Sequence, residues 1–387
     1  MDFQLTDEQR MFREMLRSFV EKEIVPVASE WEHAGRYPTE IVDSMKKMGL
    51  FGITVPEQYG GLDVDKVSFA LVFEEISRGW MGIAGILGSH SLSCWMIAKH
   101  GTQEQKQRFL PELASGQRRT GVGLTEPGAG TDLQGIRTTA RREGDTYVVN
   151  GTKTWITNAR HADPLPVLVK TDPAASPAHR GMSVLLVDTT SPGFTVSRDL
   201  PKLGYKGTES CEVVLDDVQV PATDLLGGKE GKGLQQVLSS LEIGRINIAA
   251  RSVGIAQAAY DAALDYSRQR EAFGQQISDF QAIQLQLADM AITVQASRLL
   301  TYWAASAADA GERVDLQAGM AKTFASETAM TASRDAMMIH GGYGYSQEFI
   351  VERLYRDAIL MSIGEGTNDI MRTIIAKALV DGKGTIR

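Results

Sequence analysis

The sequence is divided by the segment Leu124-Thr125-Glu126-Pro127-Gly128-Ala129-Gly130-Thr131-Asp132, a turn-forming stretch between two hydrophobic patterns. Before it, residues 1–120 carry apolar side chains at helical spacing. They also contain two capping boxes, Thr6–Gln9 and Thr102–Gln105, whose side chains can satisfy opposite backbone donors at a helix start. After it, Val, Ile and Thr become frequent and turn residues separate short apolar runs. These runs predict six strands: Thr146–Val149, Lys153–Thr157, Leu165–Lys170, Met182–Val187, Phe194–Val196 and Glu212–Leu215.

The predicted strands follow one another too closely for crossover helices, which favours an antiparallel sandwich or barrel over a parallel sheet. From residue 236 onward the chain becomes rich in alanine. Apolar residues return to helical spacing, which is typical of long antiparallel helices. The sequence therefore predicts a mainly α protein with a central β domain. Its parts are an N-terminal helical domain (1–120), a middle β domain (121–235) and a C-terminal helical bundle (236–387).

Composition excludes several classes of protein. The 387 residues carry a net charge of -8 and the pI is near 5.4, which argues against a nucleic-acid binder. There are two cysteines and six scattered histidines, so we expect no disulfide framework and no metal site. The uncharged segment Gly79–Ala98 is about one bilayer span long. Its glycines, serines and histidine predict a buried helix, and we expect no membrane span.

Two segments of the middle region could bind a flat or anionic ligand. The glycines of 124–132 let backbone N–H groups approach an anion or a ring, although a tight turn between domains explains them equally well. Trp155-Ile156-Thr157 ends a predicted strand and combines a large aromatic face with a hydroxyl, although a lone Trp is more often a core residue. Gly128 and Gly130 do not have the spacing of a dinucleotide-binding fingerprint, and no P-loop motif occurs.

Three segments of the C-terminal region carry charged or glycine-rich motifs. Arg270 closes a long predicted helix, where it can pair with a phosphate or face the helix dipole. The turn 340–345, with the sequence HGGYGY, can clasp a phosphate or simply link two helices. Glu365 lies between Gly364 and Gly366, after an apolar run and before a helix that Thr367 is expected to cap. A carboxylate in an apolar cleft suits proton abstraction, whereas a solvated loop glutamate is the plainer interpretation.

Taken together, these segments resemble the acyl-CoA dehydrogenase family, in the correct order and spacing across essentially the whole chain. The resemblance rests on LTEPGAGTD at 124–132, WIT at 155–157, REAFG at 270–274, HGGYGY at 340–345 and EGT at 365–367. It implies an N-terminal helical domain, a middle β domain and a C-terminal four-helix bundle. It also implies noncovalently bound FAD and a homotetramer built as a dimer of dimers. We expect a bacterial cytoplasmic enzyme, with a mature mitochondrial matrix protein as the alternative.

The implied reaction is the α,β-dehydrogenation of an acyl-CoA thioester to the trans-2-enoyl-CoA, with electrons passed to an electron-transfer flavoprotein. In this family a glutamate removes the α-proton, and hydride passes to the flavin N5. The backbone N–H after the glutamate helps to polarise the thioester carbonyl. Glu365 matches that base, and Gly366 matches the residue that supplies the N–H.

The resemblance also assigns binding roles to individual positions. The wall around the flavin ring matches Val122, Leu124, Thr125, Gly130, Thr131, Trp155, Ile156 and Thr157. Further FAD contacts, several of them made by a neighbouring subunit, match Arg270, Phe273, Gln281, Met338, Gly341, Gly342, Thr367 and Asp369. Substrate contacts match Thr131, Glu242, Arg245 and Gly366.

Two positions depart from patterns found within the family. A minority branch carries its base on an earlier helix, at the position of Gly244 here, and glycine cannot act as a base. Glu365 is therefore the predicted base. Met338 stands where some relatives have Gln, which puts one hydrogen bond on the adenine side in doubt. Two alternatives stay open: a flavin-dependent acyl-CoA oxidase or monooxygenase on the same scaffold, and a non-catalytic acyl-CoA-binding scaffold.

Overall fold

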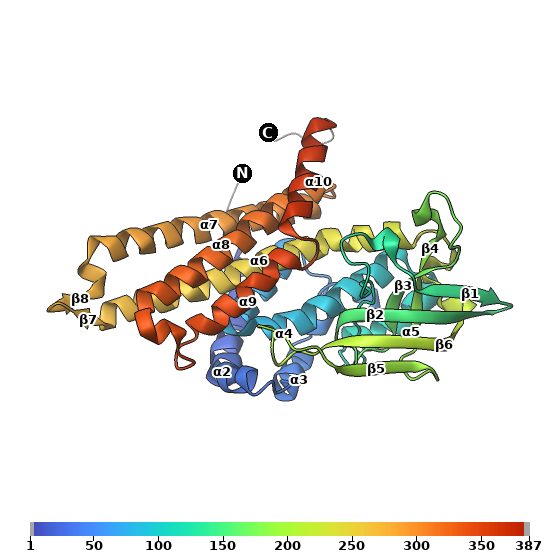
Figure 1. Ribbon diagram of the computed structural model, residues 1–387, viewed down its shortest axis with the longest axis horizontal. Helices are drawn as coiled ribbons and strands as arrows, with labels where there is room; N and C mark the ends of the chain where they lie inside the picture. The colour runs from blue at the N-terminus through green and yellow to red at the C-terminus, as the bar shows by residue number, and fades with distance from the viewer. Residues whose placement is uncertain (1–3, 383–387) are drawn as a thin grey trace.

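The computed structural model describes residues 4–382. It shows an elongated molecule with a β-sheet at one end and helices along the rest of its length (Figure 1). Both predicted capping boxes are present, with Thr6 at the start of the first helix and Thr102 at the start of the fifth. A short π-helical turn, Val20–Ile24, joins the first two helices. The N-terminal helices are α1 (Asp7–Phe19), α2 (Val25–His33), α3 (Thr39–Lys47), α4 (Lys66–His100) and α5 (Gln103–Ala114).

The central sheet has six strands in the order β4-β3-β1-β2-β6-β5. Every pairing is antiparallel except the short contact between β1 and β3. Consecutive strands pair antiparallel as β1–β2, β3–β4 and β5–β6, as their close spacing predicted. The strands are β1 (Thr139–Glu143), β2 (Thr146–Thr157), β3 (Leu165–Lys170), β4 (Met182–Val187), β5 (Phe194–Asp199) and β6 (Ser210–Pro221).

The strand prediction gave the six strands of the sheet in number, but two of the predicted strands are one and another was missed. The two predicted strands at 146–149 and 153–157 form one long strand, β2, whose pairing with β6 shifts register between Val149 and Gly151. Strand β1 was missed. Its sequence, TARRE, is mostly polar and only Ala140 is buried, so no apolar run marks it. It exists because it pairs along β2, which a local pattern cannot show.

The C-terminal half is a bundle of α6 (Gly233–Gln269), α7 (Gln281–Asp309), α8 (Asp315–His340) and α9 (Val351–Ile363), which pack against one another. Alanines fill the buried faces of α6 and α8, and these small side chains let the two helices approach closely. A hairpin of β7 (Glu271–Ala272) and β8 (Gln275–Gln276) joins α6 to α7 at the end of the molecule away from the sheet (Figure 1). The last helix, α10 (Asn368–Val380), projects from the body.

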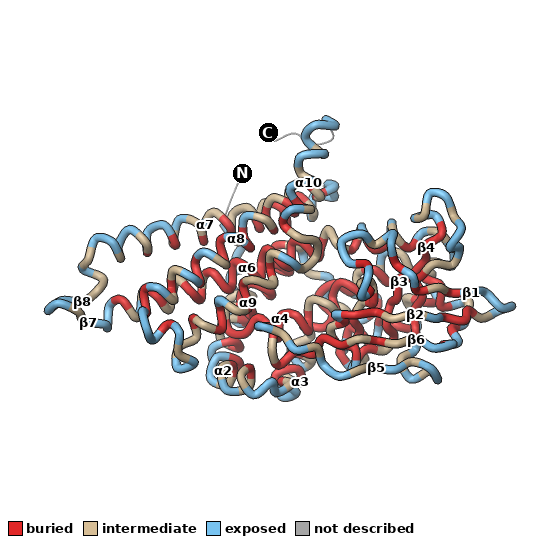
Figure 2. The backbone as a smooth tube through the Cα atoms, in the orientation of Figure 1, coloured by how far each residue is buried: buried red, intermediate tan, exposed pale blue. Residues whose placement is uncertain are grey.

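Helix α4 runs through the middle of the molecule and packs along α6 (Figure 2). It is long and apolar enough to cross a membrane, but 83% of the qualifying stretch is buried inside the protein. Its side chains therefore form protein core with α1, α6 and α8. The prediction of a buried helix at Gly79–Ala98 is confirmed.

A buried ion pair fastens the segment before β1 to the middle of β2. Lys153 has no exposed surface, and its ammonium lies 2.8 Å from Glu126 Oε1 and 3.1 Å from the carbonyl of Leu124. Glu126 also accepts from the backbone N–H groups of Arg137 and Thr138. Burial lowers the pKa of Lys153 to about 8. Burial would raise the pKa of Glu126, but its hydrogen bonds from Lys153 and Thr138 hold that pKa below its usual range.

We predict that Lys153→Met lowers the free energy of unfolding by about 3–5 kcal/mol, because Glu126 would be left buried without its counter-ion. Denaturant-induced unfolding measures the loss. Lys153→Met combined with Glu126→Gln should lose less than the sum of the single changes. Arg372→Met, which opens the exposed pair with Glu327, is the matched control and should cost at most about 1 kcal/mol. A loss for Lys153→Met as small as that of the control would contradict this account.

Candidate active site

A cavity of about 780 Å³ lies where the sheet, α4, α6 and the connection between α9 and α10 meet. Segments far apart in the sequence face one another across it. The structure thus brings three of the five motifs together in one place. The predicted site residues that line it are Val122, Leu124, Thr125, Gly130, Thr131, Trp155, Ile156, Thr157, Arg245, Glu365, Gly366 and Thr367.

One wall of the cavity is suited to a flat ring. Trp155 has φ 62°, a conformation that is rare for a bulky side chain, and the residue stays 57% exposed. Backbone strain of this kind persists where the surroundings impose it, and it clusters at ligand sites. Around Gly128 there is open space where a Cβ would stand, and at Gly130 the nearest atom would be 3.7 Å away. An aromatic cofactor can therefore approach the backbone of 124–131 beside Trp155.

Glu365 lies in the short connection between α9 and α10, in a backbone conformation with φ 55°. The next residue, Gly366, has φ 95°, which a side chain would strain. The Glu365 carboxylate faces the cavity. Burial raises its pKa, while the positive charges of Arg245, Arg251 and Lys322 oppose that rise. A carboxylate with a raised pKa at the wall of a cavity is suited to accept a proton near neutral pH.

Gly244 on α6 makes room for this carboxylate. A Cβ at position 244 would lie 2.8 Å from Glu365 Oε2 and 3.1 Å from its Cδ, closer than such atoms pack. The two candidate positions for a base, 244 and 365, thus lie side by side in space. A side chain at 244 would force the Glu365 carboxylate to shift from its observed position.

Lys322 on α8 binds the connection between α9 and α10. It has no exposed surface, and its ammonium donates to the carbonyl of Gly366 at 2.7 Å, to that of Ser362 at 3.2 Å and to Asn368 Oδ1 at 2.8 Å. Asn368 Oδ1 also accepts from Ser326. Burial lowers the pKa of Lys322 to about 8, although the nearby Glu365 opposes that shift. One buried cation thus fixes both sides of the connection that carries Glu365.

The remaining predicted residues lie outside the cavity. Glu242 is on α6 but does not line it, and Asp369 points into solvent beside Arg372. The other group lies around the β7–β8 hairpin and the turn after α8, at the far end of the bundle, where Phe273 is 96% exposed and Met338 is 69% exposed (Figure 1). Within one chain the structure does not bring this group to the cavity: Arg270, Phe273, Gln281, Met338, Gly341 and Gly342.

Sequence reasoning missed Lys322, Asn247 and Arg251, of which the last two line the cavity from α6. A signal was available for Lys322. It lies three residues after Gly319 and three before Ala325, on the face of α8 that alanines mark as buried. Arg251 likewise lies on a mostly apolar stretch of α6. A charged residue on a buried helical face is expected to have a specific partner or role.

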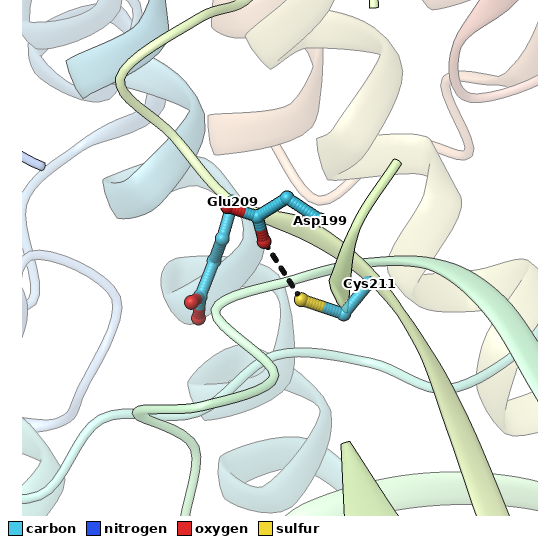
Figure 3. A group of neighbouring side chains, drawn as sticks. All are labelled: Asp199, Glu209 and Cys211. Atoms are coloured by element: carbon cyan, nitrogen blue, oxygen red, sulfur yellow. Dashed lines mark hydrogen bonds between the residues drawn. The ribbon is translucent and has the colours of Figure 1, made fainter. Parts of the chain in front are cut away.

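A cluster outside the cavity resembles a metal site in composition. The ligand atoms of Asp199, Glu209 and Cys211 lie within 4.8 Å of one another (Figure 3). The guanidinium of Arg160 faces all three, at 2.5 Å from Asp199, 3.2 Å from the Cys211 sulfur and 3.4 Å from Glu209. Burial raises the pKa of the Cys211 thiol to about 12. A protein cation therefore already balances this cluster, and the thiol stays protonated at neutral pH.

Sequence models of three domains match the chain in succession. The acyl-CoA dehydrogenase N-terminal domain matches residues 6–117, the middle domain residues 121–218 and the C-terminal domain residues 231–380. A probable acyl-CoA dehydrogenase of Bacillus subtilis is 45% identical over 98% of this chain and 100% of its own length. A caffeyl-CoA reductase–Etf complex subunit of Acetobacterium woodii is 38% identical over 97% of this chain and 99% of its own.

The fold has close counterparts among solved structures. Butyryl-CoA dehydrogenase from Megasphaera elsdenii superposes with a TM-score of 0.95 and is 39% identical, covering 98% of this chain and 100% of that one. The helical ends, the central sheet and their order along the chain are therefore shared. The protein belongs to the acyl-CoA dehydrogenase family of FAD-dependent oxidoreductases.

Proposed function

We propose that this enzyme removes the α-proton and the β-hydrogen of an acyl-CoA thioester to give the trans-2-enoyl-CoA, with Glu365 as the base. One observation carries the proposal: the Glu365 carboxylate lies at the wall of a 780 Å³ cavity, against Gly244, with a raised pKa. An apolar wall around a base excludes water, and it keeps the pKa of the base near the pH at which the enzyme works.

The residues of the cavity fit FAD. The backbone of 122–131 and Trp155 to Thr157 would hold the flavin ring. The glycines of the first segment leave open space, Trp155 presents an exposed ring and Thr157 a hydroxyl. When bound, FAD accepts the β-hydrogen as hydride. No described residue accepts a hydrogen bond from the N–H of Gly366, so this donor is free to bind the thioester oxygen as negative charge develops there. Lys322 fixes the Gly366 peptide through its carbonyl.

The reverse reaction, reduction of an enoyl-CoA, is a second candidate function. A relative named as a reductase–Etf complex subunit is 38% identical over 97% of this chain and 99% of its own, so an enoyl-CoA reductase on this scaffold is a specific alternative. That name also supports an electron-transfer flavoprotein as the partner of this enzyme. An oxidase or monooxygenase would instead pass electrons to oxygen. The non-catalytic scaffold is set aside, because the chain belongs to a family of enzymes.

An anaerobic titration of the holoenzyme with acyl-CoA thioesters of different lengths tests the proposal. Loss of the visible flavin absorbance supports dehydrogenation, and its slow return in air argues against an oxidase. Loss of that absorbance only with an electron donor, and its recovery with enoyl-CoA, favours the reductase. An unchanged spectrum with every thioester and every enoyl-CoA contradicts both directions.

We also propose that two copies complete each FAD site within a homotetramer in the cytoplasm. The FAD contacts at the far end of the bundle cannot reach the cavity of their own chain, and Phe273 and Met338 there are exposed. Leu285 and Ile292 on α7 add further exposed apolar surface. Light scattering gives the mass, and a monomer that retains FAD would exclude the shared site.

The first prediction from this site concerns the base. Glu365→Gln should lower the rate of flavin reduction by roughly 10²–10⁴-fold, because the amide cannot accept the α-proton. Stopped-flow absorbance measures the rate, and thioester binding should persist. Glu327→Gln is the matched control, since Glu327 is an exposed carboxylate on α8 that pairs with Arg372. A Glu365→Gln rate within a few fold of that control would show that another group is the base.

The second prediction concerns pH. Glu365 must be ionised to act, so the rate should fall as pH drops through its pKa, which burial has raised. Lys322 favours the ionised form. Its replacement by Met should therefore raise that pKa and move the acidic limb of the pH–rate profile to higher pH, while Lys322→Arg should move it less. A uniform loss of rate at every pH, with no movement of the limb, would mean that Lys322 acts only on the backbone.

A further inference from the structure

Arg251 is a buried cation in the wall of the active-site cavity. It lies on α6 seven residues after Gly244, which is two helical turns, so both residues face the same side of the helix. Only 6% of Arg251 is exposed, and it lines the cavity together with Glu365. The end of this cavity on α6 thus contains a guanidinium where a hydrocarbon chain would require an apolar wall.

No carboxylate of the described residues forms an ion pair with this guanidinium; the negative charge on which it acts is that of Glu365, beyond ion-pair distance. Within residues 4–382 it forms no ion pair, its Nε has no hydrogen-bond partner and its Nη2 donates only to the sulfur of Met81, a weak acceptor. Its other contact is with the ring of Tyr205, at 5.4 Å from the ring centroid. Arg245 lines the same cavity and its Nε also has no hydrogen-bond partner, but its Nη1 pairs with Asp315 at 3.0 Å.

The neighbours of Arg251 make this part of the cavity polar. Asn247, one turn before it on α6, is 5% exposed and lines the cavity without a side-chain hydrogen bond among the described residues. Two glycines of α4 make room here. A Cβ at Gly88 would lie 2.8 Å from Asn247 Nδ2, and one at Gly85 would overlap the hydroxyl of Tyr205. The two glycines thus leave space for the Asn247 amide, which has no hydrogen-bond partner among the described residues, and for the Tyr205 hydroxyl.

We propose that the acyl group of the substrate carries a second carboxylate at its distal end, and that Arg251 binds this carboxylate with help from Asn247. The inference rests on the proposed function, because Glu365 fixes where the α-carbon must lie. A planar guanidinium matches a carboxylate in a bidentate geometry that no neutral group reproduces. A buried charge without an ion pair is costly, so a ligand that supplies the opposite charge would bind with a favourable electrostatic interaction that the free protein lacks.

The geometry favours a short chain. Gly244 lies beside the Glu365 carboxylate, and two helical turns place Arg251 about 10 Å further along α6. Arginine side chains on a helix lean back toward its N-terminus, which brings the guanidinium closer to Glu365 than its Cα is. The substrate class is therefore the CoA monothioester of a short dicarboxylic acid.

The test compares charged and neutral thioesters on the holoenzyme. Succinyl-, glutaryl- and adipyl-CoA are paired with butyryl-, pentanoyl- and hexanoyl-CoA, and kcat/KM for flavin reduction is measured for each. Wild-type enzyme should prefer the best carboxylated thioester over its neutral counterpart by about 10²-fold or more. Arg251→Met should reduce that ratio by at least the same factor, mainly through KM, and Arg251→Lys should keep part of it.

Lys202→Met is the matched control. Lys202 lines the same cavity, but its ammonium already donates to the Thr208 carbonyl and to Ser210 Oγ, so its loss should leave the ratio unchanged. A wild-type enzyme that is reduced equally well by charged and neutral thioesters overturns the inference and leaves the proposed function standing. Loss of FAD in Arg251→Met with no change in the ratio also overturns it, because Arg251 would then serve the cofactor. Failure of every thioester to reduce the flavin contradicts the proposed function itself.

Discussion

The site depends on the close approach of the Glu365 carboxylate to Gly244, where a Cβ would lie only 2.8 Å from Oε2. This approach requires a glycine on α6, a left-handed turn at Glu365 and a connection short enough to be fixed at both ends. The bundle supplies these conditions, since α6 and α8 approach closely through alanines and α9 delivers the connection to the cavity. The sheet adds the wall on which a flat ring can rest. Residues of three parts of the chain, the central sheet, α6 and the connection between α9 and α10, thus form the candidate active site together.

Buried charge is handled differently at each of four positions. Lys153 is paired with Glu126 and fastens the cavity wall, while Lys322 is satisfied by two carbonyls and an amide. Arg245 is paired with Asp315. Arg251 alone forms no ion pair and donates only to the Met81 sulfur, although it is buried like the others and its charge acts on Glu365. A buried charge is costly unless an opposite charge or hydrogen bonds compensate it. The fold supplies this compensation for Lys153, Lys322 and Arg245, whereas Arg251 points to a ligand that would supply it.

Local sequence patterns predicted those features that depend on local physics. The capping boxes at Thr6 and Thr102 located two helix starts, and glycines around Glu365 marked a sharp connection before a capped helix. Strand β1 could not be predicted, because its polar residues take strand geometry only by pairing with β2. The proximity of Gly244 to Glu365 and the roles of Lys322 and Arg251 join residues that only the fold brings together. Family motifs pointed to Glu365 as the proposed base, but they did not show which residues fix its position.

Exchange of the α-proton tests the role of Glu365 most directly. The holoenzyme is incubated in D₂O with a 3-thiaacyl-CoA, a thioester whose α-carbon is acidic but whose β-position carries sulfur and no hydrogen. Mass spectrometry then measures deuterium at the α-carbon. We predict that the wild-type enzyme incorporates deuterium rapidly and that Glu365→Gln lowers the rate of incorporation by at least about 10²-fold. Equal incorporation by both proteins would contradict the assignment of Glu365 as the base.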